Sequence, residues 1–296
     1  MEASAWLDAE RGNLVAAVRY AADHGPRWAA WRLADSLRGY LYLRMHVADW
    51  EVVGTAALRA AEAEGALAGQ AAARLSLGLL YVMTGRYDDA VAGYTAARAA
   101  CRAAGWPSGE AAALGNLGNV HLELDRLDEA AETYAESLEM HRRTGVIAGE
   151  AGQLANLALV QGIRGDLHAA AENLVTALDL HRRLGSRVSE GRNLANLGDA
   201  YLRLGRLSEA TAAVTEALAV HRELGDRRTE SSTMCVLAAV HRDAGRLTEA
   251  LDTARGAVAR TGAAGWRPYD RAEAVLALAG VQKALGETGA AYAGYR

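Results

Sequence analysis

The sequence repeats with a period of forty residues. One column of this repeat holds leucine in five successive units, and these residues are Leu77, Leu117, Leu157, Leu197 and Leu237. The column that follows holds only small residues, which are Gly78, Gly118, Ala158, Gly198 and Ala238. A period of roughly 20 to 50 residues is typical of arrays in which each unit buries its apolar face against its neighbours. The sequence therefore predicts a stack of similar units instead of a single central core.

Each unit predicts two α-helices joined by a tight turn. Glycine stands at the turn in four of the five units, at Gly85, Gly165, Gly205 and Gly245. There it supplies the positive φ that ends the first helix. Five residues later comes a column of alanine, which lets the two helices approach closely: Ala90, Ala130, Ala170, Ala210 and Ala250. Because the chain is rich in the helix formers Ala and Leu and has only three prolines, we predict an all-α fold.

The period also predicts how the chain is divided. Residues 1–30 predict an amphipathic N-terminal helix that packs on the first unit. The units that follow are residues 31–70, 71–110, 111–150, 151–190, 191–230 and 231–271, with a truncated unit at 272–296. Because the stretch Ala290–Tyr295 stops partway into a predicted second helix, we expect an exposed apolar edge there and self-association through it.

Charge and cysteine content argue against several classes of function. The formal net charge is −4 and the only lysine is Lys283, which argues against a nucleic-acid-binding surface. Cys101 and Cys235 lie far apart and form no metal-binding pair, which favours a reducing compartment. No apolar run reaches the roughly 18–20 residues of a membrane span, and the N-terminus lacks the basic-then-apolar order of a signal peptide. We expect a soluble cytoplasmic protein without direct contact to nucleic acid or membrane.

The columns as a set resemble the tetratricopeptide repeat. The phrases LGNLGNV at residues 114–120, LANLA at 154–158 and LANLG at 194–198, with the forty-residue period, are similar to a longer subclass. That subclass occurs in kinesin light chains, polarity adaptors and bacterial signalling ATPases. The resemblance covers residues 31–296. It implies a right-handed superhelical solenoid in which the first helix of each unit lines a concave face.

The opening stretch AWLDAERGNLVAA at residues 5–17 carries a second resemblance. It is similar to the segment that follows the ATPase module in actinobacterial STAND (signal transduction ATPase with numerous domains) regulators. These include the SARP-type transcriptional regulators of antibiotic biosynthesis. The resemblance implies an effector sensor that restrains an ATPase module in cis, although no phosphate loop of the Gly-x-x-x-x-Gly-Lys-Ser/Thr type occurs in this chain. The alternative is a stand-alone adaptor that binds an extended peptide or protein partner.

Polar residues that recur on the first helices are the candidate binding site. One column holds Asn116, Asn156 and Asn196, and Asn119 and Asp199 follow one turn later. Because Asn is a poor mid-helix residue, its repetition needs a reason. The amides could pair with the main chain of a peptide in the groove, as in related light-chain and adaptor repeats, or they could form a structural ladder between units. Arg192, Arg203 and Arg242 would add selectivity for an acidic partner, unless they are solvated surface arginines.

Other repeated or clustered side chains favour structural roles. The forty-residue step separates His141, His181 and His221 too widely to share a metal, so we predict a capping and surface role. His121 and His241 predict packing with one polar contact. An aromatic cluster in the first unit would close its core, with a small-ligand pocket as the alternative: Trp28, Trp31, Tyr40, Tyr42 and Trp50.

The sequence contains no arrangement typical of catalysis. No nucleophile pairs with a base, no two acids share an apolar context, and no metal-ligand spacing occurs. We therefore predict a binding protein that is not an enzyme and needs neither a cofactor nor a metal. The candidate partners are its own ATPase module, a peptide or protein, and a small-molecule effector.

Overall fold

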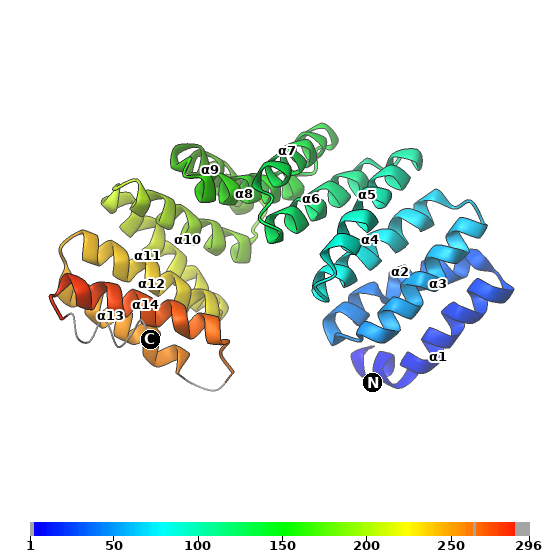
Figure 1. The fold of residues 1–296 in the computed structure, drawn as a ribbon, viewed down its shortest axis with the longest axis horizontal. Coiled ribbons are helices and arrows are strands. Elements are labelled where there is room, and N and C mark those ends of the chain that lie inside the picture. The colour runs from blue at the N-terminus through cyan, green and yellow to red at the C-terminus, as the bar shows by residue number, and fades with distance from the viewer. Residues whose placement is uncertain (1–2, 263–264, 288–296) are drawn as a thin grey trace. The chain divides into compact units, whose positions relative to one another are not determined.

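A computed structural model describes residues 3–262 and 265–287, and all regular elements in this part of the chain are α-helices (Figure 1). The fourteen helices described there are α1 (Ala3–His24), α2 (Arg27–Arg44), α3 (Val47–Ala63), α4 (Leu67–Met83), α5 (Tyr87–Ala103), α6 (Pro107–Glu123), α7 (Leu127–Thr144), α8 (Ile147–Arg164), α9 (Leu167–Arg183), α10 (Arg187–Arg203), α11 (Leu207–Leu224), α12 (Arg227–Asp243), α13 (Leu247–Thr261) and α14 (Pro268–Ala284). The predicted all-α fold is confirmed. None of these helices combines the length and apolar character needed to span a membrane.

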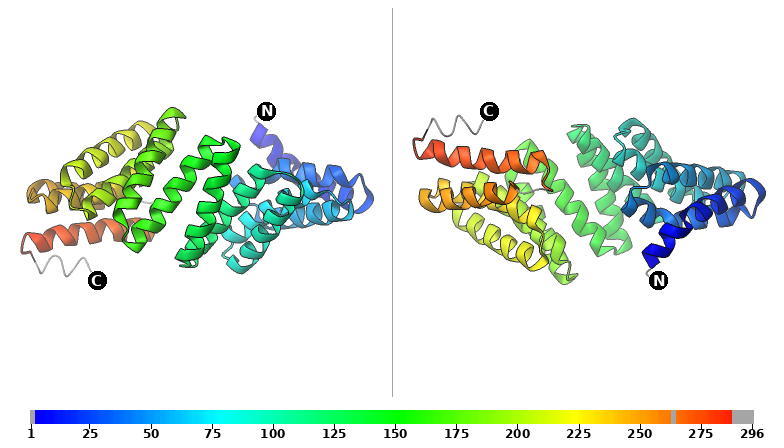
Figure 2. Two further views of the ribbon diagram at one scale, coloured as in Figure 1. Left: turned by 90° about the horizontal axis from the view of Figure 1, so that it is seen from above. Right: turned by 90° about the horizontal axis from the view of Figure 1, so that it is seen from below.

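The helices form two compact units, residues 1–146 and 147–296. In the first unit, α1 packs against α2 and α3, and the hairpins α4–α5 and α6–α7 follow. In the second unit, α8–α9, α10–α11 and α12–α13 are successive hairpins. Helix α14 packs on both α12 and α13, and Figure 2 shows it in red beside the orange α13 in both views. Each unit is thus a short stack of helix pairs.

The forty-residue period is visible in where the helices begin. The first helices of the pairs are the even-numbered ones, and α2, α4, α6, α8, α10 and α12 start at residues 27, 67, 107, 147, 187 and 227. The unit starts placed by the sequence, near residue 31 and every forty residues after it, therefore fall four residues inside these helices. Helix α14 begins at Pro268, one residue later than the period gives. The predicted apolar edge at Ala290–Tyr295 lies outside the described residues.

The small column marks where the two helices of a pair cross. A Cβ placed on Gly118 would lie 2.5 Å from the Tyr134 ring, and one on Gly198 would lie 2.3 Å from Cγ2 of Val214. A real methyl group cannot come so close, so glycine is required for this approach. Where the column holds Ala158, its core cluster contains Leu174 in place of the tyrosine. At this crossing a larger residue in the small column thus faces a smaller partner than the tyrosine that faces Gly118.

The turn between the helices of a pair requires a left-handed residue. Gly205 has φ of 73°, and in the one predicted turn without glycine Asp125 takes the same conformation with φ of 57°. Asp tolerates this region better than most residues with a side chain. The turn chemistry predicted from the sequence is therefore present in the structure.

Candidate binding face and pocket

The predicted binding residues lie on the first helices of their pairs. Asn116 and Asn119 lie on α6 of the first unit, whereas the other six lie in the second unit. These six are Asn156 on α8, Arg192, Asn196, Asp199 and Arg203 on α10, and Arg242 on α12. On α10 the spacing of three to four residues places its four members along one helical face. The structure thus brings the polar residues of α10 together and leaves Asn156 on the adjacent first helix.

The repeated amides at the column of Asn156 carry no internal hydrogen bonds. In the described part of the chain neither Asn116, Asn156 nor Asn196 has a hydrogen-bonding partner, and Asn196 is exposed. A structural ladder would require such bonds, so the geometry favours amides that are free for a ligand. Asn119 differs, because its Oδ1 accepts a hydrogen bond of 2.8 Å from the Tyr134 hydroxyl. That residue is therefore a structural contact between α6 and α7.

A hollow of about 100 Å³ opens between α8, α9 and α10, and we call it the α8–α10 pocket. Its apolar lining comes from all three helices and comprises Ala158, Leu159, Ile163, Leu167, Ala170, Leu174 and Ala200, together with the backbone of Gly162. Leu159 and Ile163 are unusually open for aliphatic residues, with 46% and 52% of their surface exposed. The pocket is therefore an apolar depression that solvent can reach.

The polar side of this pocket is formed by Asn196, Asp199 and Arg203. The Arg203 guanidinium donates to the Gly162 carbonyl at 2.8 Å, while its other nitrogen, Nη1, lies 3.9 Å from the Asp199 carboxylate. Burial among the apolar walls raises the pKa of Asp199, and the charge of Arg203 opposes this only in part. The carboxylate is therefore held in a setting that disfavours its charge.

Of the other two predicted arginines, only Arg242 is paired with an acid among the described residues. Arg192 is exposed, and Arg242 donates to the neighbouring Asp243 at 2.7 Å. Together with the Arg203–Asp199 contact, two of the three arginines lie beside an aspartate. The selectivity for an acidic partner that the sequence suggested remains a prediction, and the charges around the pocket are mixed.

A column of buried acidic residues was missed by the sequence reading. It lies in the first turn of the first helices and includes Glu110, Glu190, Glu230 and Asp270, all at most 8% exposed. Arginines late in the preceding second helix pair with it: Arg102 to Glu110 at 2.5 Å, Arg182 to Glu190 at 3.0 Å and Arg222 to Glu230 at 2.8 Å. The signal in the sequence is an Arg followed eight residues later by Glu, at forty-residue intervals.

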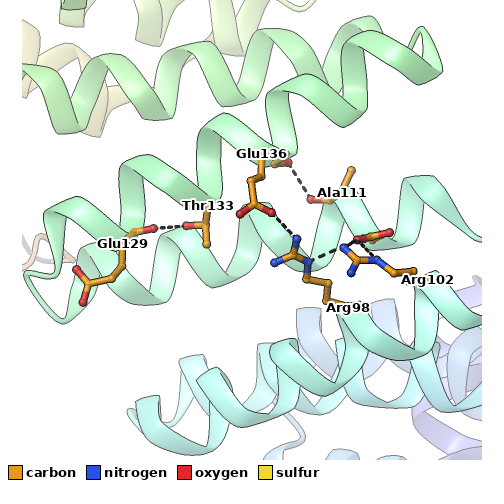
Figure 3. A network of polar contacts seen from close by, with 8 residues as sticks. Arg98, Arg102, Ala111, Glu129, Thr133 and Glu136 are labelled. Atoms are coloured by element: carbon orange, nitrogen blue, oxygen red, sulfur yellow. Dashed lines mark hydrogen bonds and ion pairs between the residues drawn. The ribbon is translucent and has the colours of Figure 1, made fainter.

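These acids tie neighbouring pairs of helices together. Figure 3 shows Arg98 of α5 between Glu136 of α7 and the carboxylate that also binds Arg102, which is that of Glu110 on α6. In the second unit Glu190 accepts from Arg182 and Arg187. Burial acts to raise the pKa of Glu190, but these two arginines outweigh it and hold the pKa below its usual range. The column therefore joins each pair of helices to the one before it.

The predicted surface role of the repeated histidines is wrong. His141, His181 and His221 are buried, with 8%, 7% and 1% of their surface exposed. The carbonyls of these residues do cap the second helices, because each accepts a loop N–H at 2.9–3.0 Å. The rings, however, face inward, and burial lowers the pKa of all three. Position near a helix end did not reveal which way the side chains point.

The other two histidines differ from each other. Nδ1 of His241 accepts from Arg246 at 2.9 Å, which is the single polar contact expected of it. Nδ1 of His121 is buried and has no partner among the described residues. The two cysteines are also buried, which raises the pKa of Cys101 to about 11 and that of Cys235 to about 12. Such thiols are unreactive at neutral pH.

The aromatic cluster of the first unit is divided between core and surface. Trp50 is 1% exposed and donates to Ser76 at 2.8 Å, so it closes the core as predicted. Tyr40 is also buried and donates to Asp8 at 2.8 Å. Trp28 is 51% exposed, with the Arg32 guanidinium 5.5 Å from its ring centroid. These contacts favour packing over a small-ligand pocket.

Comparison with known proteins agrees with the repeat architecture. A family model described as tetratricopeptide repeat matches residues 69–143, 150–223 and 193–262. No curated protein matches the sequence. Among solved structures, RapI in its apo form is similar over 90% of this chain and 95% of its own, with a TM-score of 0.71 at 12% identity. BtubC from P. vanneervenii is similar over 76% of this chain and 94% of its own, with a TM-score of 0.65 at 21% identity.

A third structure is longer than this chain. It is a signal transduction ATPase with numerous domains (STAND) protein with a tetratricopeptide repeat sensor, from Pyrococcus horikoshii. The TM-score is 0.67 at 17% identity, and the match covers 96% of this chain but only 45% of the other. At such identities these likenesses show a common fold alone.

Proposed function

Because the chain belongs to the tetratricopeptide repeat family, whose members bind peptides and proteins, we propose that its second unit binds an extended peptide segment along α8 and α10. The observation that carries this proposal is the pair of unpartnered amides, Asn156 on α8 and Asn196 on α10, of which Asn196 lines the open α8–α10 pocket. An extended peptide has unpaired main-chain N–H and C=O groups at regular spacing, and a side-chain amide can both donate to and accept from them. The adjacent pocket would take one of the apolar groups of the peptide.

The finer proposal is that this binding unit is the sensor of a STAND-type transcriptional regulator. The opening stretch at residues 5–17 and the likeness to a STAND protein with a repeat sensor support it. In such a regulator the repeats would restrain an ATPase module of the same polypeptide until an effector is bound. The second candidate is a stand-alone sensor or adaptor, which is favoured by the match over 95% of RapI and 84% of the quorum sensor NprR.

Double substitution of Asn156 and Asn196 by Ala tests peptide binding. The probe is an array of random-sequence octapeptides, and we expect the variant to lose most of the wild-type signal. Its melting temperature should stay constant or rise, since Ala is the better helix former by up to about 0.7 kcal/mol per residue. Asn13→Ala, on α1 of the first unit, is the control and should leave binding unchanged. A lower melting temperature together with unchanged binding would mean that the amides are structural.

The gene sequence separates the two finer candidates. A phosphate-loop motif encoded in frame upstream of Met1 would support the STAND regulator. A stop codon and a separate promoter directly upstream would rule it out in favour of the stand-alone protein.

A further inference from the structure

The Asp199 carboxylate lacks the hydrogen-bond donor that its counterpart in the first unit has. Residues 119 and 199 occupy the same column, two periods apart, as do residues 134 and 214. At Asn119 the side-chain oxygen accepts from the Tyr134 hydroxyl at 2.8 Å. In α11 the corresponding residue is Val214, which is fully buried and has nothing to donate. The change of Tyr to Val therefore leaves the oxygens of Asp199 available to a ligand.

Arg203 does not fill this role. Its Nη1 lies 3.9 Å from Asp199 Oδ2, beyond hydrogen-bond distance, while Nη2 is engaged by the Gly162 carbonyl at 2.8 Å. Among the described residues no other contact to the Asp199 carboxylate is present. A half-exposed carboxylate among apolar groups is stabilised by a further cation that reaches it, because burial disfavours its charge and Arg203 compensates that charge only in part.

The wall opposite Asp199 is aliphatic. Leu159 and Ile163 on α8 occupy the same columns as Asp199 and Arg203 on α10, one period earlier. Helix α8 therefore presents two exposed aliphatic side chains to the pocket, and α10 presents a carboxylate. A ligand that matches both sides has an unbranched aliphatic stem that ends in a positive charge.

We propose that the α8–α10 pocket receives a lysine side chain of a partner peptide, with its methylene stem against Leu159 and Ile163 and its ammonium donating to Asp199. The proposal rests on the proposed function in one respect, namely that the ligand is a peptide. Lysine fits better than arginine because its charge is compact and its stem is linear, whereas the Arg203 guanidinium already occupies one side of a pocket of about 100 Å³. An acidic side chain is disfavoured because it would be repelled by Asp199 at close range.

The chain offers a direct probe of this pocket, because it has only two isoleucines. Ile163 lines the pocket, and Ile147 lies at the start of α8 outside it. Protein labelled with ¹³C at the isoleucine δ1 methyl group therefore gives two signals, one a reporter and the other an internal reference. Ile147→Val assigns them. The probes are Nα-acetyl-lysine methylamide and Nα-acetyl-norleucine methylamide, which share a stem but differ in the ammonium group.

We expect the lysine probe to shift the Ile163 signal saturably and leave Ile147 in place. The norleucine probe should bind at least about fivefold more weakly, as should the lysine probe to Asp199→Asn, since each change removes one partner of a charge-assisted hydrogen bond. Asp243→Asn is the matched control, because that carboxylate lies on α12 and is paired with Arg242. Equal binding of both probes, or equal loss in the two Asp variants, would overturn the proposal.

The failure of this inference and the failure of the proposed function have different signatures. If octapeptides bind through Asn156 and Asn196 with no preference for lysine and no response to Asp199→Asn, the lysine site is wrong and peptide binding stands. If the lysine probe engages Ile163 but no octapeptide depends on the amides, the lysine site stands and the extended-peptide function is wrong.

Discussion

A single methyl group decides how closely two helices of a pair approach. At Gly198 an added Cβ would lie 2.3 Å from Val214, whereas at Gly152 no atom lies within 4 Å. Both glycines lie within first helices, so they share the same gain in helix propensity on substitution and differ only in the space available.

We expect Gly198→Ala to lower the stability of the second unit by about 1–2 kcal/mol, because overpacking at the crossing outweighs the helix propensity of alanine. Gly152→Ala should instead raise stability by about 0.5–1 kcal/mol. Urea denaturation followed by circular dichroism measures both variants. A gain in stability for Gly198→Ala would show that the crossing has room for a methyl group.

Residue identity within a column was predictable from the period, but residue role was not. The small column was assigned to the helix crossing, and the structure places it there. The column of Asn119 and Asp199 is also visible in the sequence, yet Asn119 accepts a hydrogen bond from the Tyr134 hydroxyl, whereas Asp199 faces no such donor in Val214. That difference depends on the residue fifteen positions later, which lies on the second helix of the pair and is Tyr134 in one unit and Val214 in the other. The columns of the first helix alone therefore do not reveal it.

At the scale of elements, the junction between one pair of helices and the next depends on the buried acids. Glu190 is 5% exposed and joins α10 to the end of α9 through Arg182. The exposed Glu209 accepts a hydrogen bond from Arg206, three residues earlier, and has no ion pair with another helix in the part of the chain that the structure describes. The same substitution at these two positions therefore compares a carboxylate buried at a junction with one on the surface.

We expect Glu190→Gln to destabilise the second unit by about 1–3 kcal/mol. The neutral amide would replace a buried carboxylate that accepts hydrogen bonds from both Arg182 and Arg187. Glu209→Gln should have no measurable effect, as is usual for exposed ion pairs. Thermal unfolding of the two variants beside wild type provides the test. Equal melting temperatures for both would mean that the junction does not depend on this carboxylate.

The sequence predicted helix ends better than it predicted their contacts. The forty-residue period predicts the two helices of each unit, but it does not show that Arg182 and Glu190 meet. Whether a side chain at a helix end is buried depends on how the loop returns the chain into the next helix. Here the loop brings Arg182 at the end of α9 next to Glu190 at the start of α10. The same effect buried His181, which the sequence placed on the surface.

At the scale of the whole molecule, five histidines share one electrostatic property. Burial lowers the pKa of His121, His141, His181, His221 and His241. In the unfolded chain their pKa is about 6.5, so below that pH the unfolded state binds more protons than the folded state does. Folding stability must therefore fall as the pH drops through about 6.5.

We expect the melting temperature to be lower at pH 5.5 than at pH 7.5, with each histidine that stays neutral contributing at most about 1.4 kcal/mol of the loss. His221→Gln should reduce this pH dependence, whereas His168→Gln should not, because His168 is exposed. The carboxylate of Glu190 adds its own loss only at lower pH, since its pKa is depressed. A melting temperature independent of pH between 5.5 and 7.5 would contradict the lowered pKa of these histidines.

The two units also differ in their chromophores. Five of the six tryptophans lie before residue 146, and among them Trp50 is enclosed in the first core, whereas Trp266 is the only one in the second unit. Intrinsic fluorescence therefore reports chiefly on the N-terminal stack, while the far-ultraviolet signal averages over every helix. Recording both on one sample gives a built-in comparison of whether the two stacks melt together or one after the other, without any added label.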